Sequence, residues 1–224
     1  LASIADYILT HNRPIVVPQD DSVVRFTPKH HQKIILRRSR GLPLHLQKPF
    51  SYSEEMLAVG ASMKATFTLN TQEYLYVSQY LGDSESFETQ ENFKQVLTHF
   101  LSLQNPTLAD PMTQISAIFS DAHEGYFSTQ WVVELGQSYG IPVHKIQHHQ
   151  AHLAAVVAEN DLLASTEPLL GVIWDGTGYG HDGQIWGGEF YVFSEENAPL
   201  EEQLRQNPKR LHFAFFDALL GDKM

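Results

Sequence analysis

Residues 146–160 read IQHHQAHLAAVVAEN, and residues 169–190 read LLGVIWDGTGYGHDGQIWGGEF. The first piece becomes apolar and alanine-rich after its histidines, which predicts a helix. His148 and His152 stand four residues apart, so both imidazoles project from one helix face about a turn apart. A metal ion needs this spacing from two helical ligands, although a polar helix face with hydrogen-bonded histidines would show the same pattern.

The apolar run at 169–174 predicts a buried strand that ends at Asp175. A carboxylate at a strand end, followed by a glycine turn, can face both a cation and a phosphate. Together with His148 and His152 it makes a mixed nitrogen and oxygen set, which iron, manganese or zinc accepts and calcium does not favour. His149 is one position along and points away from this helix face. We expect it either to contact one of the metal-binding side chains, without binding the metal itself, or to contact the substrate.

Several glycines follow Asp175 in the sequence. The loop after Asp175 can form a phosphate-binding nest of backbone N–H groups, although a tight hairpin turn would use the same glycines. A second glycine pair, Gly187 and Gly188, lies within a predicted strand at 184–193. Glycines weaken a strand, so their presence there indicates that a backbone segment or a ligand approaches closely. The candidate nucleotide-binding residues are Gly176, Thr177, Gly178, Gly187, Gly188 and Lys64.

Composition narrows the class of protein. The 224 residues are 42% hydrophobic and 18% charged, which suits a soluble globular protein with one domain or one and a half. The chain has no cysteine, which excludes a disulfide framework, a thiolate zinc site and a thiol nucleophile on it. A net charge of −11 argues against nucleic-acid or anionic-membrane binding, and without a spanning run or a leader we expect a cytoplasmic location.

Residues 1–48 resemble the end of a domain. A short helical pattern runs into an extended segment, and strand-like runs follow at 20–26 and 33–40. Basic residues between 29 and 40 can bind a nucleotide phosphate or lie on a solvated strand edge. Residues 41–54 have two prolines, a glycine and no periodicity, so we place a linker at 49–54.

The rest of the chain alternates strands and helices, which predicts an α/β fold with a mixed sheet. Lys64 falls at a strand junction, where it can also be a solvated turn residue. Asp121, His123 and Tyr126 follow a short strand, where such sheets place ligands, although a capped loop would look the same. The elements expected before the histidine helix are strands at 56–63, 64–70 and 73–82, a helix at 84–104 capped by Ser84 or Ser86, a strand at 115–119, a helix at 127–138 and a strand at 141–145.

Several motifs resemble the hydrogenase-maturation carbamoyltransferases of the HypF type. The segments at 10–25 (THNRPIVVPQDDSVVR) and 36–41 (LRRSRG) are similar to the end of that family's YrdC-like domain. Five ordered motifs are similar to its threonylcarbamoyl-transferase-like domain, namely LAVGASMKATFTL, SQYLGD, DAHEGYFST, IQHHQAHLAAVVAEN and DGTGYGHDGQIWGGEF.

The resemblance implies the first half of an actin-like (ASKHA, ribonuclease-H-like) domain at 55–224, after the C-terminal part of a YrdC-like domain at 1–48. It implies transfer of a carbamoyl group from carbamoyl phosphate, through ATP-dependent carbamoyl-adenylate, to the C-terminal cysteine of a HypE-like partner, on the route to the cyanide ligands of nickel-iron hydrogenase. The implied cofactors are ATP and a divalent metal (iron, zinc or magnesium) held by His148, His152 and Asp175.

The chain departs from the family pattern in extent and in detail. Most of the YrdC-like domain and the second half of the transferase domain have no counterpart in it, so we expect an incomplete fragment. Leu220 stands where the family tends to have a second glycine, and HEGY at 123–126 replaces a more usual HPDY. The alternatives are a tRNA threonylcarbamoyl transferase, an actin-like kinase, or a non-catalytic remnant that docks a partner.

Overall fold

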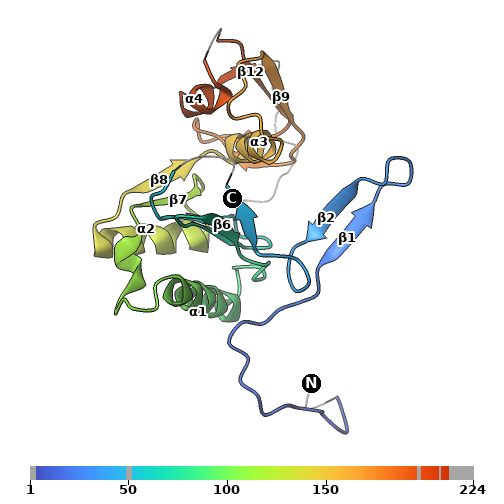
Figure 1. Ribbon diagram of the computed structural model, residues 1–224, viewed down its shortest axis with the longest axis vertical. Coiled ribbons are helices and arrows are strands. Elements are labelled where there is room, and N and C mark those ends of the chain that lie inside the picture. The colour runs from blue at the N-terminus through green and yellow to red at the C-terminus, as the bar shows by residue number, and fades with distance from the viewer. Residues whose placement is uncertain (1–3, 49–51, 196–197, 207, 212–224) are drawn as a thin grey trace.

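The computed structural model describes residues 4–48, 52–195, 198–206 and 208–211 (Figure 1). The departure predicted at Leu220 therefore lies outside the described residues, as do residues 49–51 of the predicted linker. No helix in the described part of the chain is long and apolar enough to cross a membrane.

A six-stranded mixed sheet forms the larger unit. Its strand order is β3-β6-β5-β4-β7-β8, with antiparallel pairing from β3 to β4 and parallel pairing from β4 to β8. The predicted meander and the two following strands are confirmed. The strands are β3 (His45–Gln47), β4 (Met56–Val59), β5 (Phe67–Asn70), β6 (Tyr74–Val77), β7 (Ala117–Asp121) and β8 (Val143–Ile146).

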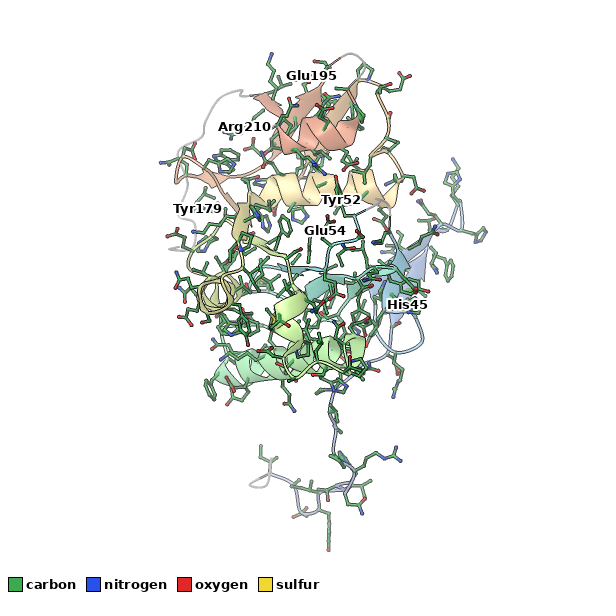
Figure 2. The ribbon with its side chains drawn as sticks, turned by 60° about the vertical axis from the view of Figure 1, so that its left-hand side comes forward. His45, Tyr52, Glu54, Tyr179, Glu195 and Arg210 are labelled. Atoms are coloured by element: carbon green, nitrogen blue, oxygen red, sulfur yellow. The ribbon has the colours of Figure 1, made fainter. Side chains whose placement is uncertain are left out.

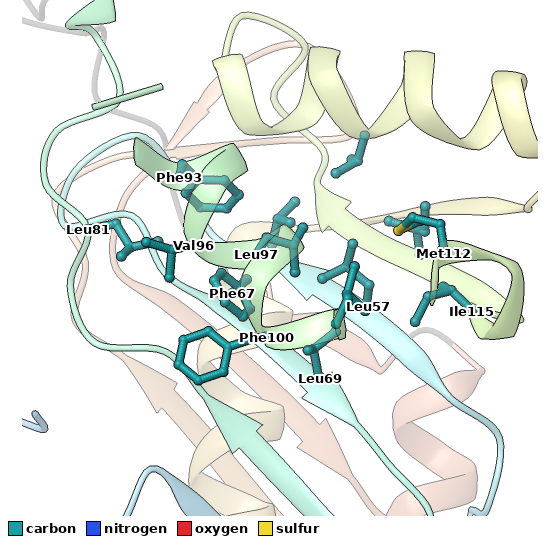
Figure 3. Packing of buried hydrophobic residues seen from close by; sticks show 14 of the residues in the cluster. Leu57, Phe67, Leu69, Leu81, Phe93, Val96, Leu97, Phe100, Met112 and Ile115 are labelled. Atoms are coloured by element: carbon teal, nitrogen blue, oxygen red, sulfur yellow. The ribbon is translucent and has the colours of Figure 1, made fainter. Parts of the chain in front are cut away.

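Helices α1 (Phe87–Gln104) and α2 (Phe127–Tyr139) cover one face of this sheet. Of the two serines predicted as caps for α1, Ser86 is the one that accepts from Thr89 N. Alternate residues of β4 point into the core, and Leu57 belongs to the same buried cluster as Phe67 and Phe93, whose rings meet edge-on (Figure 3). A short 3-10 helix, η1 (Pro111–Gln114), leads into β7.

A three-stranded antiparallel sheet, β13-β12-β9, forms the smaller unit. Helices α3 (His148–Glu159) and α4 (Leu200–Arg205) pack against it through Leu153, Val157 and Leu200. Its strands are β9 (Leu169–Ile173), β12 (Glu189–Phe193) and β13 (Lys209–Leu211). Figure 1 shows α3 between this sheet and the larger one.

Two predictions about this smaller unit are wrong. The strand predicted to be buried is half-buried, because α3 covers only one face of β9 and leaves Leu170 57% and Val172 42% exposed. The strand predicted at 184–193 is broken at Gly187 and Gly188. Its first part, β11 (Ile185–Trp186), pairs instead with β10 (Gly178–Tyr179) in a small hairpin.

The N-terminal region also differs from expectation. The helical pattern at its start is wrong, since the described residues from 4 to 14 contain no helix. The two predicted strands are confirmed as an exposed antiparallel pair, β1 (Val23–Phe26) and β2 (Lys33–Arg37). Strand β3 lies before the predicted linker yet hydrogen-bonds to β6, so the larger sheet begins earlier than the predicted boundary at 49–54.

Candidate metal centre

The structure brings together the three side chains predicted to bind a metal. Nε2 of His148 lies 3.1 Å from Oδ2 of Asp175 and 3.2 Å from Nε2 of His152. Nε2 of His152 lies 3.6 Å from the same carboxylate oxygen. One ligand atom from each residue lies within 4.8 Å of the others.

Helix capping and strand termination place these groups. Gln147 caps α3, because its side chain accepts a hydrogen bond from the backbone N–H of Gln150. His148 is therefore the first residue of α3, and His152 lies one turn later on the same face. Asp175 follows β9 by two residues, so the smaller sheet brings its carboxylate to the start of the helix.

Asp121, the last residue of β7, supports His148 from behind. Its Oδ2 lies 2.7 Å from Nδ1 of His148, and its Oδ1 accepts from the backbone N–H of His123. This hydrogen bond, together with the charges of Asp121 and Asp175, raises the pKa of His148 against the opposing effect of burial. A carboxylate behind a histidine fixes the ring orientation and leaves the other nitrogen for a metal.

The donor set fits a divalent cation. With Nδ1 of His148 donating to Asp121, its Nε2 presents a lone pair toward the Asp175 carboxylate. Oδ2 of Asp175 is buried and has no hydrogen-bond partner among the described residues. Nε2 of His148, Nε2 of His152 and Oδ2 of Asp175 lie 3.1 to 3.6 Å apart, and lone pairs at such distances repel one another. A cation between these three atoms would bind all of them. Two imidazoles and a carboxylate suit zinc or iron better than magnesium.

His149 lies behind the cluster. Its side chain is fully buried, so it cannot contact a substrate at the surface, and burial lowers its pKa. Its Nε2 is 3.8 Å from Oδ2 of Asp175. Of the two roles predicted for it, only support of a ligand agrees with this position.

The glycines after Asp175 differ in backbone conformation. Of Gly176, Gly178, Gly180 and Gly183, only Gly183 has a positive φ, of 74°, which is the left-handed conformation that one kind of anion-binding nest uses. Gly178 instead makes room for the ring of His149, because a Cβ on Gly178 would overlap Cε1 of that ring. At Gly178 the close neighbour is therefore a side chain of the protein.

Gly187 has no close neighbour among the described residues. A Cβ there would meet the backbone oxygens of Asp175 and Gly176, each at 3.9 Å, and no other described atom within 4 Å. Lys64 lies in the exposed turn between β4 and β5, with φ of 52° and its Nζ 6.0 Å from the centre of the Tyr80 ring. The nucleotide-binding roles assigned to both residues stay predictions, as do those of Gly176, Thr177, Gly178 and Gly188.

The polar cluster predicted after β7 adjoins the metal cluster. The ring of His123 stacks on Tyr126 with centroids 4.3 Å apart, and Tyr179 of the hairpin meets His123 edge-on at 5.2 Å. Burial raises the pKa of Tyr126, and the charges of Asp121 and Asp175 raise it further. In Figure 2, Tyr179 of the β10–β11 hairpin lies apart from Tyr52 and Glu54.

Sequence reasoning missed the residues that hold the hairpin. Trp186 donates from Nε1 to Asp182, and the Arg210 guanidinium lies 3.5 Å from the centre of its ring. Arg210 also forms a two-point ion pair with Glu189, at 2.5 and 2.7 Å. These residues come from three strands and one loop, so no local pattern could have indicated the contact with Arg210.

Two arginines of the basic segment at 29–40 form ion pairs with aspartates. Arg37 pairs with Asp20 at 3.3 Å, and Arg40 pairs with Asp21 at 2.6 Å. Arg38 donates to the backbone oxygen of Pro43. These contacts favour the solvated strand edge over a phosphate site.

Two family models match the chain. Residues 51–159 match the HypF Kae1-like domain, and residues 171–208 match the second subdomain of the carbamoyltransferase Kae1-like domain. The carbamoyltransferase HypF of Synechocystis sp. is 42% identical over 198 residues, which cover 87% of this chain and 24% of that protein. The probable carbamoyltransferase HypF of Methanocaldococcus jannaschii is 34% identical over 208 residues, covering 91% of this chain and 26% of that protein.

Solved structures agree with these sequence matches. The crystal structure of T. kodakarensis HypF aligns with a TM-score of 0.71 and 32% identity, over 90% of this chain and 23% of that chain. A full-length HypF in a phosphate- and nucleotide-bound form aligns with a TM-score of 0.67 and 32% identity, over 82% and 22% of the two chains. The chain thus has the expected actin-like architecture and spans about a quarter of the length of the relatives it matches. It belongs to the HypF family.

Proposed function

We propose that this chain carries the metal-binding and nucleotide-binding region of a cytoplasmic carbamoyltransferase that acts in nickel-iron hydrogenase maturation. The observation that carries the proposal is the convergence of His148, His152 and Asp175, with Asp121 behind them, in a chain of the HypF family. Within the longer protein, residues 1–48 are assigned to the end of a YrdC-like domain.

The proposed reaction moves a carbamoyl group from carbamoyl phosphate, activated with ATP as carbamoyl-adenylate, to a HypE-like partner. The thiolate of the partner's C-terminal cysteine attacks the carbamoyl carbon, a carbon–sulfur bond forms, and the bond to the AMP phosphate oxygen breaks. AMP leaves with the electron pair of that bond. This chain has no cysteine, so the nucleophile belongs to the partner.

The residues of the chain have distinct roles in this proposal. His148, His152 and Asp175 would hold the divalent metal, which supplies Lewis-acid polarisation of acyl or phosphate oxygens when bound. Asp121 fixes the orientation of His148. The nucleotide would lie beside Gly187, where an added Cβ would have no described atom nearer than 3.9 Å. Support for a nucleotide comes from the HypF structure described as phosphate- and nucleotide-bound.

The test is transfer of a labelled carbamoyl group, in the full-length enzyme, from carbamoyl phosphate to a HypE-like protein. We expect ATP-dependent labelling of the partner by the wild type, none by His152→Ala, and normal labelling by His144→Ala, which removes an exposed imidazole outside the cluster. Labelling by His152→Ala at the wild-type rate would refute the assigned site. Binding of the partner by the wild type without transfer would instead support the docking alternative.

A further inference from the structure

A buried hydrogen-bond chain leads from the smaller sheet to His149, beside the candidate metal ligand Asp175. It consists of Tyr191 on β12, Gln147 at the cap of α3, and His149 on α3. The side chains of Tyr191, Gln147 and His149 are at most 1% exposed, which is unusual for an amide and an imidazole. Buried polar groups of this kind are retained where each has a defined partner.

Two backbone groups fix the orientation of the Gln147 amide. Its Oε1 lies 3.0 Å from the backbone N–H of Gln150, which can only donate. Its Nε2 lies 3.2 Å from the backbone oxygen of Tyr179, which can only accept. A flipped amide would put donor against donor and acceptor against acceptor at these two positions.

This orientation determines the tautomer of His149. Nε2 of Gln147 is 3.1 Å from Nδ1 of His149, and because the amide nitrogen donates, Nδ1 must accept. The single ring proton of the neutral imidazole therefore lies on Nε2. A protonated Nε2 has no lone pair, so His149 cannot be a metal ligand in this arrangement.

The proton on Nε2 is directed at Asp175. Nε2 of His149 and Oδ2 of Asp175 are 3.8 Å apart, and both are buried atoms without a hydrogen-bond partner among the described residues. One is a donor and the other an acceptor, so a small movement of the carboxylate satisfies both. Gly178 and Trp186 lie against the ring, with the Trp186 ring stacked at 6.5 Å, and hold it in place.

We infer that Gln147 and His149 are positioning residues, in which the Gln147 amide keeps the proton of His149 on Nε2 so that His149 orients the Asp175 carboxylate toward the metal. This inference rests on the proposed metal site. It separates two adjacent histidines by role: His148 offers a lone pair to the cation, and His149 offers a proton to the carboxylate.

The first test reads the tautomer in the metal-free, full-length enzyme. Histidine labelled with carbon-13 and nitrogen-15 is observed by solid-state NMR, and the His149 signal is identified by its loss in His149→Gln. We expect a neutral ring protonated on Nε2. A ring protonated on Nδ1 would overturn the inference, and this measurement needs no folded His149→Phe variant.

The second test measures affinity for Zn²⁺ alone by competition calorimetry. His149→Phe keeps the ring and removes the donor, so the affinity should fall about tenfold or more, as for other partners of metal ligands. His149→Gln retains an N–H near the position of Nε2 and should stay within about threefold of the wild type, since it keeps that partner. His144→Phe is the matched control and should have no effect.

The outcomes separate this inference from the proposed site. If His148→Ala abolishes zinc binding while His149→Phe binds as tightly as the wild type, the positioning role is wrong and the metal site stands. If the wild type itself does not bind zinc, iron or magnesium, the metal site fails and the positioning role falls with it.

Discussion

Oδ2 of Asp121 lies 2.7 Å from Nδ1 of His148, although 27 residues separate them in the sequence. The contact arises because β7 and β8 are parallel neighbours in which Asp121 pairs with Ile146, two residues before His148. A strand end and a helix start therefore meet at one edge of the larger sheet. The following predictions concern the full-length enzyme.

Asp121→Asn should lower metal affinity about 10- to 100-fold, the usual cost of losing a carboxylate behind a histidine ligand. Both oxygens of Asp121 accept hydrogen bonds, from His148 and from the backbone of His123, so an amide must place its NH₂ against one of these donors. Calorimetric titration with Zn²⁺ measures the effect. Glu124→Gln, an exposed acid that pairs with Lys145, serves as the control and should leave the affinity unchanged.

His148→Ala and His152→Ala should each abolish bound metal and carbamoyl transfer, because only one of the two imidazoles and one carboxylate would remain. Elemental analysis of the purified proteins gives the metal stoichiometry. His144→Ala should retain full metal content. Normal stoichiometry in both cluster variants would rule out the proposed centre.

Gly187→Val should weaken nucleotide binding by about tenfold or more, equivalent to about 1.4 kcal/mol, with the fold retained. The first added carbon has room within the protein, since its nearest neighbours are two backbone oxygens at 3.9 Å, but it occupies the space proposed for the ligand. Calorimetry with a non-hydrolysable ATP analogue tests the affinity, and thermal unfolding tests the fold. An unchanged affinity would count against the assigned nucleotide position.

Gly178→Ala and Gly176→Ala form a matched pair for the packing of His149. A Cβ on Gly178 overlaps the buried ring, so we expect a loss of about 1–3 kcal/mol in the free energy of unfolding. A Cβ on Gly176 has no heavy atom of the described residues within 4 Å, and this substitution should leave the free energy of unfolding nearly unchanged. Urea denaturation of both variants gives the comparison, and equal stabilities would contradict the packing role.

Local periodicity predicted most of the larger sheet and its helices. The alternation in β4, where Leu57 and Val59 face the core, and the apolar face of α1 are properties of neighbouring residues, and a single sequence contains them. The spacing of His148 and His152 likewise follows from helical geometry alone. The predicted helix and the predicted strand before Asp175 indicated that Asp175 approaches these histidines, but only the structure gives the distance.

Features that depend on distant partners could not be predicted. Strand β3 is too short and irregular to stand out, and it exists because β6 offers an unpaired edge. The break at Gly187 and Gly188 reflects pairing of β11 with β10, which periodicity does not reveal. The hydrogen bond that Asp121 accepts from His148 depends on the parallel register of β7 and β8, and the tautomer of His149 depends on the orientation of one amide.

His148 touches both sheets: Asp121 belongs to the six-stranded sheet, and Asp175 follows a strand of the three-stranded one. A cation at this junction would link the two units in addition to its role in the reaction. Because His148 would bind the cation while its other ring nitrogen contacts Asp121, metal binding would stabilise the contact between the two units, and removing the metal with a chelator should lower the thermal unfolding temperature.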